Sequence, residues 1–218
     1  MTSLWLTRIV PHLHSREARR DFRNAVDLHY RVMTLFPDGL GDQARKQLGI
    51  LFRAEDTSAG PYLLLQSRIR PDLDKLPPGY GYGDSRPLTP LLEALRPGLP
   101  VRYRIDASAV RKPRKTTQAL YGLKPLVPLT GPAAEAWWQR QAEQSGLKVD
   151  TIHTTRLDAA AGVKGPHKQR IHNARTRFEG KALVSDPNLL RQRVEEGIGR
   201  GKAYGCGLLS LAPASPAA

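Results

Sequence analysis

His29 is the side chain in this sequence best suited to moving a proton. It lies in a segment from Asp21 to Phe36 whose apolar spacing is typical of a helix. On a helix of about 3.6 residues per turn it shares a face with Val32 and Met33, which favours a partly buried core histidine. Because imidazole titrates near neutral pH, the same residue also suits general acid–base catalysis. Residue type and spacing leave these two interpretations open.

The segment from Gly197 to Gly207 (GIGRGKAYGCG) is the densest motif. Its glycines allow the backbone to adopt positive φ and to approach a ligand closely, and exposed amides there are able to bind an anion. An NTPase phosphate loop requires a glycine where Glu196 stands, and a dinucleotide fingerprint opens a helix instead of following one. The motif therefore predicts an anion-binding loop of another kind. Its glycines are Gly197, Gly199, Gly201, Gly205 and Gly207.

Positive charge extends along the whole chain. The 34 Lys and Arg against 20 Asp and Glu give a formal charge of +14, which is costly unless a polyanion neutralises it. A solvated surface is the simpler interpretation of each basic cluster, but several clusters in one chain favour a continuous phosphate track. Aromatic residues make up only 6%, so recognition of an RNA duplex or hairpin is favoured over base stacking. The predicted RNA-binding residues are Arg16, Arg19, Arg20, Arg31, Arg111, Lys112, Arg114, Lys115, Lys168, Arg170, Arg175, Arg177, Arg200 and Lys202.

Other kinds of site are disfavoured. The six histidines have no cysteine or carboxylate at metal-ligand spacing, so neither a metal nor another cofactor is expected. Cys206, the single cysteine, lies among glycines and is expected to be a small apolar filler. No run of about 18 apolar residues and no signal peptide are evident, which predicts a cytoplasmic protein without a membrane partner.

The elements that must position these residues suggest an α+β fold of two tandem ferredoxin-like domains with antiparallel sheets. The first half has the order strand, helix, strand, strand, helix, strand. Its expected elements are a strand at 4–10, the helix at 21–36, strands at 47–55 and 62–69, a loop at 72–86, a short helix from Thr89, and a strand at 101–105. We expect residues 1–108 to form the first domain, 109–130 a basic linker, and 131–218 a second domain that carries the glycine-rich loop.

Several segments in the same order resemble the CasE family, the CRISPR repeat-processing endoribonuclease subunits of the Cascade complex. The segments are LWLTRIV, SREARRDFRNAVDLHYRVMTLFP, YLLLQS, VRYRIDAS and GIGRGKAYGCGLLSLAP. The last is the most specific. The resemblance implies two ferredoxin-like domains and a catalytic histidine at His29, six residues before Leu35. Some members carry a catalytic tyrosine three residues before the histidine, where this chain has Val26.

The resemblance also implies the reaction. Such an enzyme binds the CRISPR repeat hairpin and cuts precursor CRISPR RNA at the stem base, by attack of a 2′-hydroxyl on the adjacent phosphate. The reaction needs no metal and leaves 2′,3′-cyclic phosphate and 5′-hydroxyl ends. The enzyme then holds the guide RNA among other Cascade subunits. His29 is expected to act as general base or general acid, while cations such as Arg31 or Lys202 stabilise the developing charge.

Two alternatives remain. Val26, in place of the tyrosine, keeps open a non-catalytic structured-RNA-binding subunit of a ribonucleoprotein. Charge alone also allows a ribosome- or tRNA-associated structural protein, which predicts no preference for a repeat hairpin.

Overall fold

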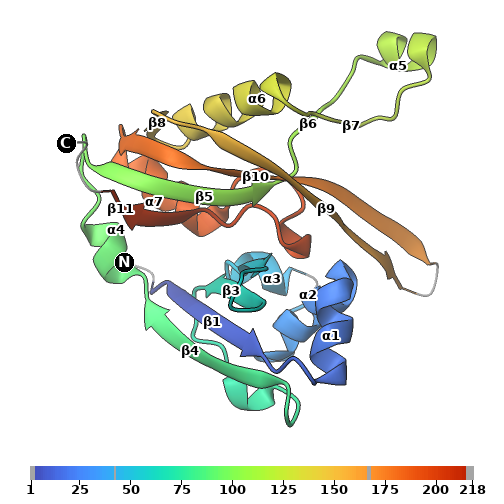
Figure 1. Ribbon diagram of the computed structural model, residues 1–218, viewed down its shortest axis with the longest axis vertical. Coiled ribbons are helices and arrows are strands. Elements are labelled where there is room, and N and C mark those ends of the chain that lie inside the picture. The colour runs from blue at the N-terminus through green and yellow to red at the C-terminus, as the bar shows by residue number, and fades with distance from the viewer. Residues whose placement is uncertain (1–2, 42, 166–167, 215–218) are drawn as a thin grey trace.

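The computed structural model describes residues 3–41, 43–165 and 168–214. Two antiparallel sheets face each other, each with helices on its far side or at its end (Figure 1). No helix in these three ranges is long and apolar enough to cross a membrane.

The first module comprises the N-terminal sheet, in the strand order β2-β3-β1-β4. Ile9 of β1 lies opposite Leu63 of β3, and both are buried in this module's core. The elements are β1 (Trp5–Pro11), α1 (Arg16–Arg23), α2 (Ala25–Thr34), α3 (Ala44–Gln47), β2 (Leu51–Glu55), β3 (Tyr62–Ser67), η1 (Leu73–Lys75) and β4 (Gly81–Pro87).

The second module follows α4 (Thr89–Glu93) and has the strand order β11-β5-β10-β8, with β9 also paired to β10. Ile105 of β5 lies opposite Phe178 of β10, and both are fully buried in a second core around Trp138. The elements are β5 (Pro100–Ala107), β6 (Val110–Arg111), α5 (Lys115–Tyr121), β7 (Val127–Pro128), α6 (Pro132–Glu143), β8 (Leu147–Val149), β9 (His153–Lys164), β10 (Gln169–Val184), α7 (Pro187–Glu196), η2 (Lys202–Tyr204) and β11 (Ser210–Pro213).

Both sheets place the module's last strand beside its first, then its third and second. That is the ferredoxin-like arrangement, so the predicted fold class is confirmed. The second module adds β9, which extends the hairpin with β10 well beyond the sheet (Figure 1).

The predicted strand at 101–105 exists, but its assignment to the first sheet is wrong. It is part of β5, which pairs with β10 and β11 of the second sheet. The first sheet is instead completed by β4, in the segment predicted as a loop. β4 has no apolar run because it is an edge strand, and Gly81 lets it approach β1: a Cβ there would lie 2.2 Å from the Val10 carbonyl oxygen.

These pairings also move the expected domain boundary. We propose that it falls between β4 and β5, not at residue 108. The expected linker at 109–130 then lies inside the second module, between β5 and α6, where it carries α5 away from the body of the protein (Figure 1).

The predicted helix at 21–36 is two helices that break at Asn24. The Asn24 side chain accepts hydrogen bonds from the amides of Val26 and Asp27, at 2.9 and 3.3 Å, and so caps α2. Because asparagine is a strong N-cap residue, the chain turns there and starts a new helix that carries His29.

Candidate active site

His29 lies on α2, half-buried. Its Nδ1 atom is buried and has no hydrogen-bond partner among the described residues. Burial lowers the pKa of His29 below its ordinary value of 6.5, and the charges of Arg45 and Lys164 lower it further. These two cations come from α3 and β9.

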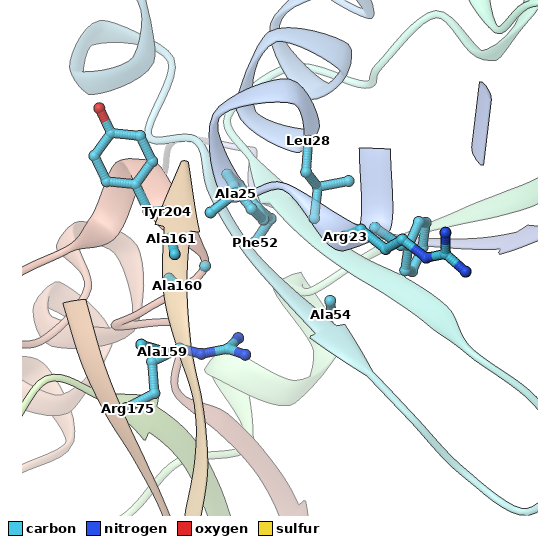
Figure 2. Close-up of a pocket in the computed structure, with 12 residues that line it drawn as sticks. Arg23, Ala25, Leu28, Phe52, Ala54, Ala159, Ala160, Ala161, Arg175 and Tyr204 are labelled. Atoms are coloured by element: carbon cyan, nitrogen blue, oxygen red, sulfur yellow. The ribbon is translucent and has the colours of Figure 1, made fainter. Parts of the chain in front are cut away.

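His29 lies where the two modules meet. The ring of Tyr204, on η2, packs edge-on against the His29 ring with 5.9 Å between centroids. Figure 2 shows the adjoining cavity of about 60 Å³, with Tyr204 and Arg175 on the side of the second module and Ala25 and Leu28 on the side of the first. The site is therefore assembled from segments far apart in the sequence.

Val26 faces the second module and is 1% exposed. A Cβ built on Gly162 of β9 would lie 2.7 Å from a Val26 methyl group and 2.4 Å from the Asn24 side-chain oxygen. β9 thus covers this position closely, and a tyrosine ring would have no room between α2 and the backbone of β9. The aromatic rings next to His29 come instead from Tyr30, its neighbour on α2, and from Tyr204 of the second module, each 5.9 Å from the His29 ring between centroids.

The glycine-rich loop has the predicted backbone conformation, since all five of its glycines have positive φ. Gly207 shows why glycine is required: its amide donates to the Asp106 carbonyl oxygen at 2.8 Å, and a Cβ would lie 2.7 Å from the Ile198 carbonyl oxygen. Gly197 packs against Leu51 in the same way. At these two positions the loop backbone therefore packs closely against other parts of the protein, and not against a ligand. Cys206 is buried as expected, and burial raises its pKa to about 12.

Lys202, in the middle of this loop, is half-buried and donates from Nζ to the Glu196 carbonyl oxygen at 2.8 Å. Burial lowers its pKa, and the charge of Arg45 lowers it further. Arg45 and Lys202 line one cavity of about 640 Å³ beside α3. Arg45 was not predicted, because it lies in an unremarkable polar segment and only the fold brings it to His29. Arg200 is exposed on the same loop.

The N-terminal arginines divide into two groups. Arg16, Arg19 and Arg20 are exposed on α1, although Arg20 pairs with Asp21 at 3.0 Å. Arg31 turns away from His29: its Nε donates to Asp21 at 2.7 Å, and its guanidinium lies 5.1 Å from the centroid of the Tyr80 ring. Because a buried carboxylate already neutralises Arg31, it is a poor candidate to stabilise charge at the site.

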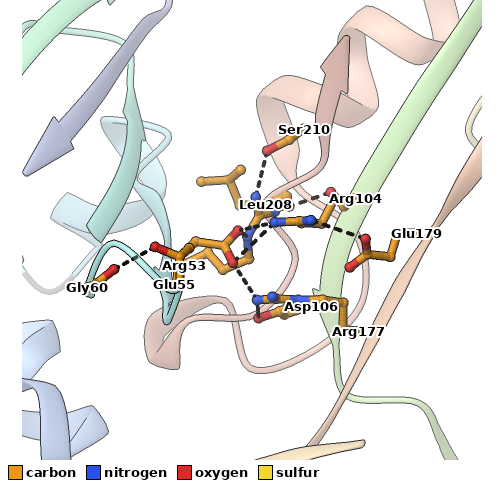
Figure 3. Close-up of polar contacts among 10 residues, drawn as sticks. Arg53, Glu55, Gly60, Arg104, Asp106, Arg177, Glu179, Leu208 and Ser210 are labelled. Atoms are coloured by element: carbon orange, nitrogen blue, oxygen red, sulfur yellow. Dashed lines mark hydrogen bonds and ion pairs between the residues drawn. The ribbon is translucent and has the colours of Figure 1, made fainter. Parts of the chain in front are cut away.

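Arg177 lies in an ion-pair network that joins the two sheets (Figure 3). It bonds Asp106 at 2.7 Å and Glu55 at 2.8 Å, while Arg53 bonds Glu55 at 2.7 Å and the Leu208 carbonyl oxygen at 3.0 Å. Burial alone raises the pKa of Glu55, but the charges of Arg53 and Arg177 lower it below its ordinary value. Arg177 is thus neutralised inside the protein, and we leave it out of the RNA surface.

The remaining predicted cations fall on two surfaces. Lys168 and Arg170 are exposed on the β9–β10 hairpin, and Arg175 on β10 donates to the Asp158 carbonyl oxygen at 2.7 Å. The others are exposed on the insertion that carries α5, which Figure 1 places far from α2. These are Arg111, Lys112, Arg114 and Lys115.

Within the described ranges, no three His, Cys, Asp or Glu side chains are close enough to hold a metal ion. One of the six histidines, His167, lies outside those ranges.

Comparison with known proteins identifies the family of this chain. The family described as "CRISPR associated protein" matches residues 4–213. The chain is 30% identical to CRISPR-associated endoribonuclease Cse3 of Thermus thermophilus, over 96% of this chain and 100% of the relative. It is 28% identical to the CRISPR system Cascade subunit CasE of Escherichia coli K12, over 90% of this chain and 96% of the relative.

The structure of Thermus thermophilus Cse3 bound to an RNA representing a pre-cleavage complex superimposes with a TM-score of 0.77. The two sequences are 27% identical, and the match covers 97% of this chain and 100% of that one. The resemblance predicted from the sequence segments is confirmed: this chain belongs to the family of CRISPR-associated endoribonucleases that includes Cse3 and CasE.

Proposed function

We propose that this protein is an endoribonuclease that binds a CRISPR repeat hairpin and cuts precursor CRISPR RNA at the base of the stem. The observation that carries the proposal is the position of His29. This half-buried histidine, whose pKa is lowered, lies where the two ferredoxin-like modules meet. The chain matches an endoribonuclease along almost its whole length. The charge of +14 supplies the attraction for the RNA backbone.

His29 acts on the 2′-hydroxyl. Its Nδ1 is buried, so Nε2 is the ring nitrogen that exchanges a proton with RNA. The lowered pKa keeps the ring neutral, which suits a general base. The 2′-oxygen gives its proton to Nε2 and attacks phosphorus; the bond to the 5′-oxygen breaks, and that oxygen takes a proton from water. The products are a 2′,3′-cyclic phosphate and a 5′-hydroxyl, and no metal takes part in these steps.

Two exposed basic surfaces flank His29 and are proposed to hold the stem. One is α1 with Arg16 and Arg19, and the other is the β9–β10 hairpin with Lys168 and Arg170. Exposed cations of this kind release counterions when they bind phosphates, so affinity should fall steeply with salt. Holding the stem rigidly also aligns the attacking oxygen with the leaving oxygen.

Membership of the family that includes a Cascade subunit supports a second stage. After cleavage, the protein keeps the hairpin of the guide RNA and joins the other Cascade subunits. This role places it in the cytoplasm, where the one thiol, buried at Cys206, stays reduced.

The experiment is cleavage of a cognate repeat hairpin in EDTA under single-turnover conditions. His29→Ala is expected to lower the rate by about 100-fold to 10,000-fold while RNA binding persists. His14→Ala, which changes an exposed histidine, is the matched control and should cleave normally. Wild-type cleavage by His29→Ala with intact binding would overturn the assignment, and product-end analysis tests the cyclic phosphate.

A second candidate function is RNA binding without cleavage. The observation that favours it is Val26, which leaves the site without the tyrosine that some relatives use. It predicts tight binding of the repeat hairpin and no single-turnover product with the wild-type protein.

A further inference from the structure

Two half-buried cations from different modules line one cavity, and the short helix that carries the second also carries Tyr204, whose ring packs against His29. Arg45 is on α3 of the first module, and Lys202 is on η2 of the second. Both line the cavity of about 640 Å³ described above. The charge of Arg45 lowers the pKa of His29 and that of Lys202, so Arg45 is electrostatically coupled to both.

The protein satisfies these two cations only in part. Arg45 donates from Nη1 to the Ile50 carbonyl oxygen at 3.0 Å, and Lys202 donates to the Glu196 carbonyl oxygen at 2.8 Å. Both acceptors are neutral. Among the described residues, neither cation has a carboxylate oxygen within 4.0 Å.

Arg68 lines the same cavity and, unlike Arg45, pairs with a carboxylate. Its Nε lies 2.8 Å from a Glu195 carboxylate oxygen, and Nη1 donates to the Gln47 carbonyl oxygen. Arg68 is thus held by the protein. Among the described residues Arg45 makes one side-chain hydrogen bond, through Nη1, which leaves its other N–H groups to bind two oxygens of a phosphate side by side.

An anion between Arg45 and Lys202 would remove the cost of holding them together. Bringing cations out of water and near one another is unfavourable, and burial lowers the pKa of each. Repulsion of this kind is typical of a binding site for a phosphate group. The packing of Tyr204, two residues after Lys202, against the His29 ring indicates which phosphate this is: the one whose neighbouring 2′-hydroxyl His29 reaches.

We infer that Arg45 and Lys202 bind the scissile phosphate. Arg45 is then a catalytic residue: it stabilises the negative charge on the non-bridging oxygens of this phosphate during attack. This inference rests on the proposed function. It assigns to Arg45 the role expected of Arg31, whose guanidinium is bound to Asp21. Because the charge on these oxygens grows in the transition state, Arg45 contributes more to rate than to affinity.

The first test compares Arg45→Gln with Lys148→Gln, which changes an exposed lysine on β8 outside the cavity. Single-turnover cleavage by Arg45→Gln should fall about 100-fold, while affinity for a hairpin with a 2′-deoxy cleavage site changes by about threefold or less. Lys148→Gln should cleave within about twofold of the wild type. A rate for Arg45→Gln within about threefold of the wild type would overturn the inference. If Arg45→Gln does not fold, Lys202→Gln is measured in the same way, with an expected loss of about tenfold.

The second test needs no RNA. The His29 imidazole is titrated by NMR with and without inorganic phosphate, and His29→Ala identifies its signal. In the wild type, phosphate should raise the pKa of His29. In Arg45→Gln this response should disappear, and the pKa should be higher than in the phosphate-free wild type because a repelling charge is gone.

The two tests separate the two claims. A wild type that fails to cleave yet shows the phosphate response contradicts the proposed function and supports the anion site. A wild type that cleaves, with neither a phosphate response nor an effect of Arg45→Gln, leaves the proposed function intact and overturns the role of Arg45.

Discussion

The two modules meet at two clusters of charged residues that differ in one respect. In the network between the sheets, Arg53 and Arg177 each contact the fully buried carboxylate of Glu55. In the cavity beside α3, Arg45 and Lys202 contact only neutral carbonyl oxygens among the described residues. The first cluster is complete and holds the modules together. In the second cluster the two cations have no carboxylate partner among the described residues, which suits a surface that binds RNA phosphate.

The largest expected effect comes from breaking the complete cluster. Glu55→Gln leaves two buried guanidinium groups without their shared carboxylate, so the free energy of unfolding should fall by about 3–5 kcal/mol. Urea denaturation measures it, and Glu17→Gln, at a carboxylate 48% exposed, is the control, with an expected change of about 0.5 kcal/mol or less. Equal stabilities of the two variants would mean that the network does not join the modules.

The same cluster predicts acid sensitivity. The pKa of Glu55 is lower in the folded protein than its ordinary value of 4.5. The stability that Glu55 contributes is therefore present above that value and lost as the pH falls through its folded pKa. Thermal melts of the wild type should show this loss, and Glu55→Gln should lack that part of it.

The incomplete cluster predicts the pH dependence of cleavage. Since the pKa of His29 lies below 6.5, the single-turnover rate should rise with pH in the acidic range and level off before neutrality. In Arg45→Gln the midpoint should move to higher pH, because one cation no longer opposes protonation. A rate that falls across the acidic range as the pH rises would make His29 the general acid.

Tyr204 is expected to have a smaller effect, through packing. Its ring lies edge-on to His29, so Tyr204→Ala frees the imidazole and should lower the rate by about tenfold. Tyr204→Phe keeps the ring and should stay within about threefold of the wild type. If the phenylalanine variant is as slow as the alanine variant, the hydroxyl itself takes part in the reaction.

The smallest effects are expected on the exposed hairpin. Arg170→Gln should lower the salt dependence of RNA binding by about one phosphate contact and weaken binding of all hairpins alike. Arg177→Gln should leave that slope unchanged and instead lower stability, because Arg177 faces Asp106 and Glu55. An unchanged slope for Arg170→Gln would exclude this hairpin from the RNA surface.

The strand at 101–105 shows how far local pattern reaches. Its alternation of apolar and polar residues predicts a strand correctly, but this pattern does not indicate which sheet the strand joins. β4 shows the reverse case: Gly81 and Gly83 permit close pairing with β1, while a sequence without apolar alternation hides the strand. Asn24 is an N-cap residue, but the apolar spacing continues on both sides of it, so the sequence pattern predicts one uninterrupted helix.

The sequence by itself determined the ferredoxin-like repeat, the basic character of the surface, the glycine-rich loop and His29 as the residue to test, because these depend on local spacing, composition and matching segments. Only the tertiary structure decided which cations matter. Arg31 is close to His29 in sequence but is bound to Asp21, whereas Arg45 from α3 and Lys202 from the other module line one cavity. The physical reason is that the charge of a side chain is local, but its partners are set by packing between elements that are remote along the chain.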